Sequence, residues 1–220
     1  INHICFLLRK EIQKQGFDDI YLISCGRQYD SRFQTNDDLS GFDASLSFVP
    51  RTLSDVAFRK NYNLDKNSEE ENIEFLDKKF KGNIFDYSET VNNIVQRKEK
   101  KIKQLESVMF AWDNTARRGN DSNLFVNFNL TKYKQWLSHV CHKTLVNDLF
   151  SYSEKFVFIN AWNEWAEGTY LEPDRKYGYG YLKTTYETIK NFNNKNINKL
   201  NFNNNKKSKR YALLIHIHYE

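Results

Sequence analysis

The sequence has few residues that interrupt or cross-link a chain. Among 220 residues there are 2 prolines, 8 glycines, 3 cysteines and 1 methionine. No apolar run approaches the roughly 18 residues that a membrane-spanning helix needs. No Gly-x-Gly-x-x-Gly loop, the signature of dinucleotide-binding doubly wound folds, is present. These absences argue against a membrane span and against a nucleotide-binding doubly wound fold.

The cysteines and histidines give no metal or disulfide signal. Cys5, Cys25 and Cys141 are odd in number and widely spaced, so they indicate reduced, buried thiols in the cytoplasm. His216 and His218 share one face of an apolar strand. His139 and His142 share one face of a predicted helix. Neither pair has a third ligand nearby, so neither indicates a metal site. We therefore expect no metal and no cofactor.

The ends of the chain set its context. The first residues lack the basic start and the small-residue cleavage site of a signal peptide, and the chain does not begin with methionine, so we expect a piece of a longer polypeptide. Residues 190–210 carry seven basic residues and no acid, which more than accounts for the net charge of +5. This favours a solvated linker over a nucleic-acid surface. It leaves open a weak attraction to an anionic membrane, at the inner face of the cell membrane.

Strand patterns alternate with helical patterns along the first 192 residues. Short buried strands are predicted at 19–25, 42–50, 107–112 and 155–162, and helices at 3–16, 87–104, 130–150 and 180–192. This alternation predicts an α/β protein with a parallel sheet. The rest is predicted as a charged insert at 53–80, a linker at 193–209, and at 210–220 an apolar strand that begins a truncated second domain.

The densest polar patch follows the last of these strands, in the stretch NAWNEWAEGTYLEPD of residues 160–174. The carboxyl ends of parallel strands are where α/β proteins place their sites. Glu164 and Glu167 are three residues apart, so a helical turn makes them neighbours, whereas an extended strand would turn them to opposite sides. A turn directly after the strand would therefore aim both carboxylates into one cleft.

Two carboxyl groups with divided roles suit glycoside chemistry, in which one donates a proton and the other acts as base or nucleophile. A like charge and apolar walls keep one of such a pair protonated near neutral pH. Trp162 and Trp165 would supply those walls or stack on a sugar. Glutamates at this spacing also commonly cap or pair on surface helices. The density of acids, tryptophans and asparagines in one loop favours the functional interpretation.

The stretch FINAWNEWAEGTYLEPDRKYGYGYL resembles the signature of the WbsX-type proteins, which are similar to glycoside hydrolase family 99. The stretches FAWDNTARRG, GFDASLSFVP and FDYSETV resemble further parts of that pattern, and the likeness covers about residues 1–192. It implies an enzyme that acts on glycosidic bonds, by hydrolysis or transfer, in bacterial O-antigen, lipopolysaccharide or capsule biosynthesis.

The resemblance also implies a (β/α)8 barrel of the TIM type, of which this chain holds the C-terminal half. In the family 99 enzymes the first glutamate of the motif is a base towards the sugar 2-hydroxyl and the second is the general acid/base. Those roles would fall on Glu164 and Glu167, with Glu172 lining the same cleft. Since four barrel units are missing, we expect this chain alone to be inactive. Its expected partners are a glycan, the N-terminal half-barrel and a C-terminal domain of the same polypeptide.

Further binding residues are expected at two strand ends. After the third strand, Trp112 would stack on a sugar, Asp113 and Asn114 would bind hydroxyls, and Arg118 would bind a carboxylate or phosphate. The same residues could instead form a capped turn with solvated arginines. In the second loop the expected substrate-binding residues are Asn160, Trp162, Asn163, Trp165 and Glu172.

Two other functions stay open at this point. One is a carbohydrate-binding or scaffolding module in which the cleft is kept and turnover is lost. The other is a metal-dependent nucleotide-sugar transferase, which would need an Asp-x-Asp type of motif. The acidic pairs Asp18–Asp19 and Asp37–Asp38 are too weak a match to support it.

Overall fold

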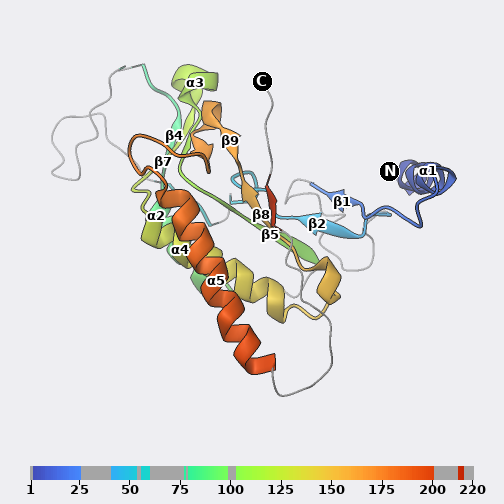
Figure 1. Cartoon of the computed structure of the whole chain (residues 1–220). Helices are drawn as coiled ribbons and strands as arrows, with labels where there is room; N and C mark the ends of the chain where they lie inside the picture. The colour runs from blue at the N-terminus through green and yellow to red at the C-terminus, as the bar shows by residue number, and fades with distance from the viewer. Residues whose placement is uncertain are drawn as a thin grey trace.

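The computed structural model describes residues 2–25, 41–53, 56–59, 77, 79–98, 103–200 and 213–215. Within them the chain forms helices α1 (Asn2–Lys14), α2 (Tyr87–Gln96), α3 (Thr115–Arg118), α4 (Leu130–Val146) and α5 (Gly180–Leu200) (Figure 1). The main sheet contains β1 (Ile23–Ser24), β2 (Ala44–Leu46), β5 (Gln104–Met109), β8 (Val157–Asn160) and β11 (Leu213–Ile215). This confirms the predicted α/β class with a parallel sheet.

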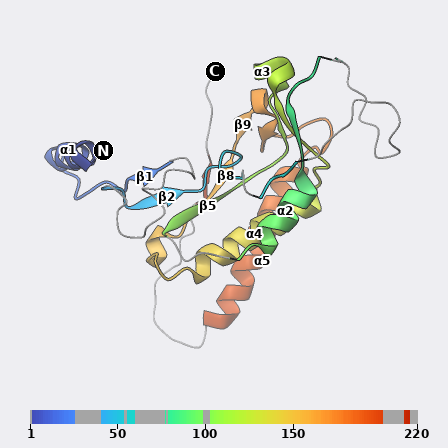
Figure 2. The same cartoon turned by 180° about the vertical axis from the view of Figure 1, so that it is seen from behind.

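The strands of the main sheet lie side by side in the order in which they occur along the chain. Each described neighbour pair, from β1–β2 through β8–β11, is parallel. Parallel crossovers are almost always right-handed, so a sheet wound in one direction carries its helices on one face. Figures 1 and 2 agree that α2, α4 and α5 gather on the same side of the sheet. A doubly wound sheet would instead place helices on both faces.

A second sheet flanks the first and was not predicted from the sequence. It contains β3 (Phe58–Arg59), β4 (Asn83–Asp86), β7 (Asn123–Val126) and β6 (Trp112–Asp113), in that order. Only β4 and β7 pair in parallel, and the two outer strands are antiparallel to them. These strands have two to four residues each, too few to give a strand pattern above the background of the surrounding loops.

The main core fills the space between the helices and the sheets. Trp136 and Tyr133 of α4 and Tyr87 of α2 are fully buried in it. The two tyrosine hydroxyls are satisfied inside, because Tyr87 donates to the Met109 carbonyl at 2.9 Å and Tyr133 pairs with Thr185 of α5 at 2.8 Å. The first bond fixes α2 to β5, the strand that leads into the predicted site, and the second fixes α4 to α5.

Side-chain caps start both of these helices. Asp86 accepts a hydrogen bond from the Glu89 backbone at the start of α2, and Asn129 accepts one from Lys132 at the start of α4. Such caps satisfy backbone donors that the first turn leaves without partners. Asp86 is itself buried and also accepts from Asn127 at 2.6 Å. The capping residues thus tie helix starts to the ends of β4 and β7.

Several predicted boundaries differ from the structure. The helix predicted to reach residue 104 ends at Gln96, because Gln104–Met109 is needed as the central strand between β2 and β8. Helix α5 continues to Leu200, into the segment expected to be linker. Leu213–Ile215 adds an edge strand to β8, and the separate second domain remains a prediction. Most of the insert, and His216 and His218, lie outside the described residues.

All three cysteines are free thiols. Cys5 is buried and Cys141 is partly buried, and burial raises the pKa of the Cys141 thiol to about 12. Cys25 is exposed, so the expectation that it packs inside is wrong. It lies just beyond the two-residue strand β1 at the edge of the sheet, where few side chains are available to cover it.

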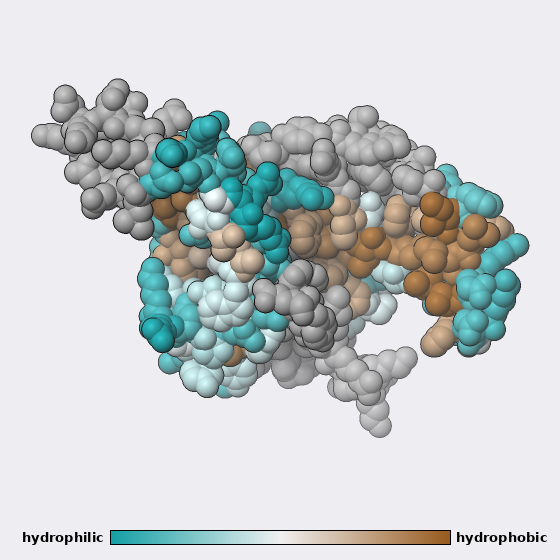
Figure 3. All heavy atoms as spheres, turned by 90° about the horizontal axis from the view of Figure 1, so that it is seen from above, coloured by the Kyte–Doolittle hydropathy of each residue, from teal (hydrophilic) through white to brown (hydrophobic). Residues whose placement is uncertain are grey.

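The first helix is poorly covered by the rest of the described chain. Of its side chains only Cys5 is buried, whereas Ile4, Phe6, Leu7 and Leu8 are 45–60% exposed. Figure 3 shows hydrophobic residues gathered at this end of the molecule. Arg9 holds the helix through ion pairs to Asp19 at 2.8 Å and Asp43 at 2.7 Å. Among the described residues, no helix is both long and apolar enough to cross a bilayer.

Candidate active site

The site is formed where two neighbouring strands end. β5 runs through Phe110 and Ala111 into β6 and the short helix α3, and β8 runs into β9 (Asn163–Glu164), the 3-10 turn η4 (Trp165–Glu167) and β10 (Thr169–Tyr170). Because β5 and β8 are parallel with Met109 opposite Asn160, their carboxyl ends open at the same edge. Figures 1 and 2 both show α3 beside β9 at this edge.

One arginine brings the two glutamates together. Arg117 of α3 donates from one terminal nitrogen to Glu167 at 2.7 Å and from the other to Glu164 at 3.0 Å. The Glu164 side chain is 6% exposed, that of Glu167 is 21% exposed and that of Arg117 is 45% exposed. The cation offsets the repulsion between the two carboxylates. A turn does follow β8, but Glu164 ends the strand β9 and only Glu167 lies in the helical turn η4.

A glycine permits this close approach. Gly168 has a φ of +64°, and a side-chain carbon at this position would lie 2.9 Å from the backbone nitrogen of Asp113. Only glycine adopts such a backbone without strain while another backbone lies against it. The loop that follows β8 can therefore pack directly on β6, which puts Glu167 within reach of Arg117.

The Arg117 contacts give a testable effect on stability. Replacing Arg117 with methionine keeps an unbranched apolar stem and removes the guanidinium from the nearly buried Glu164. We expect a loss of about 1–2 kcal/mol in the free energy of unfolding, because the arginine is partly solvated and its ion pairs are partly screened. Urea unfolding followed by circular dichroism measures this loss.

Arg118 provides a matched control for that experiment, because it is exposed on the same short helix. Arg118→Met should change stability by no more than about 0.5 kcal/mol. In a Glu164→Gln/Glu167→Gln background the cost of Arg117→Met should largely disappear, because the charges it pairs with are gone. An equal cost in both backgrounds would show that Arg117 does not act through the two glutamates.

A stacked aromatic pair lies on the other side of the same turn. The Trp165 and Tyr170 rings are 3.7 Å apart at an angle of 16°, and Trp165 donates its indole N–H to Glu172 at 2.6 Å. Tyr170 donates to Asp174 at 3.1 Å, and burial together with the charge of Asp174 raises the pKa of this tyrosine.

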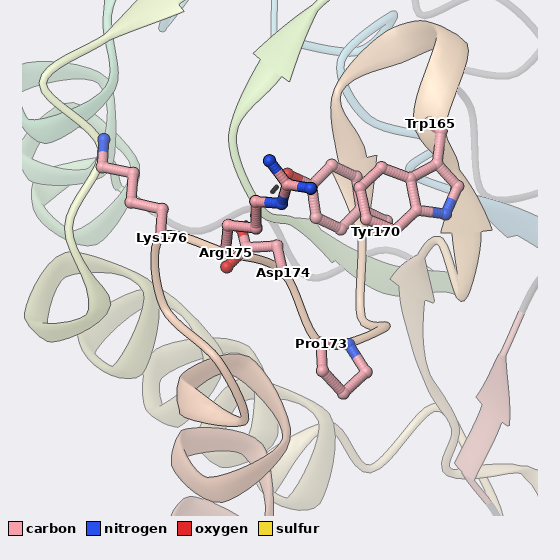
Figure 4. A pocket seen from close by; sticks show the side chains of 6 residues that line it. All are labelled: Trp165, Tyr170, Pro173, Asp174, Arg175 and Lys176. Carbon is pink, nitrogen blue, oxygen red and sulfur yellow. Dashed lines mark hydrogen bonds between the residues drawn. The ribbon is translucent and has the colours of Figure 1, made fainter.

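These rings line an open pocket of about 510 Å³ (Figure 4). The residues that line it are Trp165, Tyr170, Pro173, Asp174, Arg175 and Lys176. Neither Glu164 nor Glu167 is among them, so the hollow and the paired carboxylates are adjacent features of one loop. A shallow pocket alone specifies no reaction, so the two glutamates are the candidate chemical centre.

The residues expected after β5 have mainly structural contacts. Trp112 is 6% exposed within the core and offers little surface for stacking on a sugar. Asp113 accepts from the backbone and hydroxyl of Thr115, and the buried Asn114 accepts from the backbone of Asn123 at 2.8 Å. Arg118 is exposed, and it is the neighbouring Arg117 that reaches the glutamates. These contacts fit the turn of the alternative interpretation only in part, because Asn114 makes no side-chain cap hydrogen bond to α3 and Arg117 is ion-paired.

The residues expected after β8 are divided between the interior and the surface. Asn160 is buried, donates to the Val49 carbonyl at 2.9 Å and accepts from the Thr169 hydroxyl, which fixes the end of the strand. Trp162 is half-buried against the core, and Asn163 is half-buried in β9. Trp165 is 47% exposed and Glu172 holds its indole. Trp165 is therefore the aromatic side chain of this loop that is open to a ligand.

Within the described part of the chain, no three His, Cys, Asp or Glu side chains are grouped so that they could hold a metal ion. His139 is half-buried and His142 is exposed on α4. Asp37 and Asp38 lie outside the described residues.

Sequence reasoning did not single out Arg117, which contacts both glutamates, or Tyr170, which stacks on Trp165. For Arg117 the available signal was its place in the loop after β5, next to a loop of acids expected on the neighbouring strand. For Tyr170 it was the alternation with Thr169 in β10, which turns one of the two towards the surface. Neither signal selects these residues over Arg118 or Tyr179 without the strand pairing.

Comparison with known proteins identifies the family. The protein-family model described as "Glycosyltransferase WbsX" matches residues 1–185. The chain therefore belongs to the WbsX glycosyltransferase family. Two curated relatives, both described as "Uncharacterized protein WxcX" and found in two strains of Xanthomonas campestris pv. campestris, are 30% identical over 149 residues. The alignment covers 68% of this chain and 20% of each relative, and no solved structure matches.

Proposed function

We propose that this chain supplies the catalytic residues of an enzyme that cleaves or transfers glycosidic bonds in the assembly of a bacterial surface polysaccharide such as O-antigen, lipopolysaccharide or capsule. One observation carries the proposal: in a member of the WbsX family, two carboxylates meet at one guanidinium at the ends of neighbouring parallel strands. Most glycoside hydrolases use a pair of Asp or Glu carboxyl groups that flank the bond to be broken.

In the proposed mechanism the two glutamates have different roles. Glu164, the more buried of the pair, takes the proton of the sugar 2-hydroxyl, and the freed oxygen bonds to the anomeric carbon as the glycosidic bond breaks. Glu167, the more accessible, gives its proton to the leaving oxygen. A group that donates a proton must first carry one, and a protonated carboxyl no longer attracts a guanidinium. The contact between Arg117 and Glu167 must therefore open when substrate binds, leaving Arg117 on Glu164. Whether water or a sugar hydroxyl then accepts the glycosyl group is not decided by the carboxylates.

The substrate is proposed to be an oligosaccharide that lies along the loop after β8. Trp165 and Glu172 are its best-supported contacts, because the exposed indole is already oriented by the glutamate. Asn163, Trp162 and Asp113 border the same turn and are secondary candidates. Asn160, Asn114 and Trp112 are proposed to support the site from the interior, since all three are buried.

The finer fold assignment, half of a (β/α)8 barrel, is part of the same proposal. It is supported by strands that pair in chain order, by helices on one side, and by the exposed apolar face of α1 next to the edge strand β1. The chain spans about a fifth of the length of its curated relatives. An N-terminal half-barrel and a C-terminal domain of one polypeptide are thus the proposed partners, and a cytoplasmic location is proposed with them.

A second candidate function is a carbohydrate-binding module without turnover. The observation that favours it is the position of the stacked Trp165 and Tyr170 rings. They line a pocket that does not include the two glutamates, so they would hold a sugar without any reaction. Catalysis requires the two glutamates, whereas binding on the aromatic rings does not. A single experiment on the glutamates therefore separates the two functions.

That experiment compares product formation by the complete polypeptide containing this chain with that of its Glu164→Gln/Glu167→Gln variant. Labelled surface oligosaccharides are incubated with each protein and the products are analysed by mass spectrometry. Products that the wild type forms and the variant does not form support the enzyme. Equal product formation by both proteins would exclude this carboxylate pair. Binding without any product, even by the wild type, would support the binding module.

A further inference from the structure

The pocket beside the glutamates presents a rigid aromatic surface to solvent. Trp165 is 47% exposed, yet one face of its indole stacks on Tyr170 and its N–H is held by Glu172. Exposed apolar surface is unfavourable in water, and here the ring is not free to turn inward. A tryptophan fixed with one face open offers a large contact area that loses little conformational freedom when a ligand covers it.

The charged side chains that line this pocket differ in whether they are already engaged by other groups. Both carboxylate oxygens of Asp174 are engaged, one by the Tyr170 hydroxyl and the other by the Tyr177 backbone at 2.5 Å. The Lys176 ammonium lies 5.1 Å from the centre of the Tyr177 ring, and Figure 4 shows its side chain extending away from the two stacked rings.

Arg175 differs from these neighbours. Figure 4 shows its guanidinium on the side of Tyr170 and Trp165, and it lines the pocket with them. Among the residues that the structure describes, no carboxylate forms an ion pair with it. A planar guanidinium matches the two oxygens of a carboxylate or a phosphate, and such paired contacts add geometric selectivity.

We propose that this pocket is a subsite for an anionic sugar, with the sugar ring on Trp165 and its acid group on Arg175. The inference rests on the proposed function, because it specifies one residue of the glycan on which that function acts. The subsite selects acidic glycans over neutral ones and leaves the carboxylate pair to the bond that reacts. The same guanidinium chemistry serves a uronic acid and a phosphorylated sugar, so the test includes both.

The test measures dissociation constants by ligand-detected NMR for three probes: trigalacturonate, galactotriose and galactose 6-phosphate. For the wild-type chain we expect at least one charged probe to bind about tenfold more tightly than the neutral one, which is the usual scale of a charge-assisted contact. Arg175→Gln should remove this preference and leave binding of galactotriose unchanged. Lys176→Gln is the matched control and should keep the preference. Trp165→Ala should weaken all three probes.

The outcomes separate this inference from the catalytic proposal. Tightest binding of trigalacturonate identifies a uronic-acid subsite, and tightest binding of the phosphate identifies a phosphosugar subsite. Equal binding of charged and neutral probes, or a preference that survives Arg175→Gln, overturns the inference. The Glu164→Gln/Glu167→Gln variant should keep the preference. A preference in a protein without turnover would therefore leave the subsite standing while the catalytic proposal fails.

Discussion

Replacing Glu167 with glutamine is expected to slow the reaction of ordinary glycosides by about 100-fold or more, while slowing glycosyl fluorides by no more than about tenfold. The difference follows from the role proposed for this residue. A sugar alkoxide leaves only when it is protonated, whereas fluoride leaves without a proton. Initial rates with both kinds of donor, for the complete polypeptide and its variant, measure the effect.

Glu164→Gln is the matched comparison, because the same atoms change three residues away. A base that acts on the sugar itself is needed whatever the leaving group, so this variant should lose about 100-fold on both donors. If the two variants exchange these patterns, the acid and base roles are reversed. If glycosyl fluorides are affected equally in both, proton donation is not what Glu167 supplies.

Replacing Trp136 with alanine is expected to lower the free energy of unfolding by about 3–5 kcal/mol. This indole is 1% exposed, is surrounded by the main core and lies 5.9 Å from the Tyr87 ring. Its removal leaves a cavity between α2 and α4 that rigid helices cannot fully close. Urea unfolding monitored by circular dichroism gives the loss.

Two further variants make this result interpretable. Tyr186→Ala removes a large aromatic from α5 that is 62% exposed, and it should change stability by no more than about 0.5 kcal/mol. Trp136→Phe keeps an aromatic of smaller volume and should fall between the two. A loss below about 1 kcal/mol for Trp136→Ala would contradict the packing of α4 on β5 that positions the site.

Much of the fold could be predicted because it depends on local patterns. The strands β1, β2, β5 and β8 contain compact apolar stretches, and the helices α1, α4 and α5 begin within one residue of their predicted starts. The end of α2 could not be predicted, because whether residues 97–104 continue a helix or enter a strand depends on the neighbours β2 and β8. The second sheet was missed for the same reason, since its strands are defined by pairing.

The sequence alone determined the class of the fold, and it predicted a candidate site after a buried strand with two glutamates in it, because alternation and spacing are properties of adjacent residues. Only the tertiary structure decided which other residues join them. Arg117 is 47 positions from Glu164 along the chain, and the parallel pairing of β5 with β8 makes them hydrogen-bonding partners. The same packing buries Trp112 and leaves Trp165 at the surface. The exposure of a side chain and its hydrogen-bond partners depend on every residue that surrounds it in space. A sequence pattern shows only the residues before and after it along the chain.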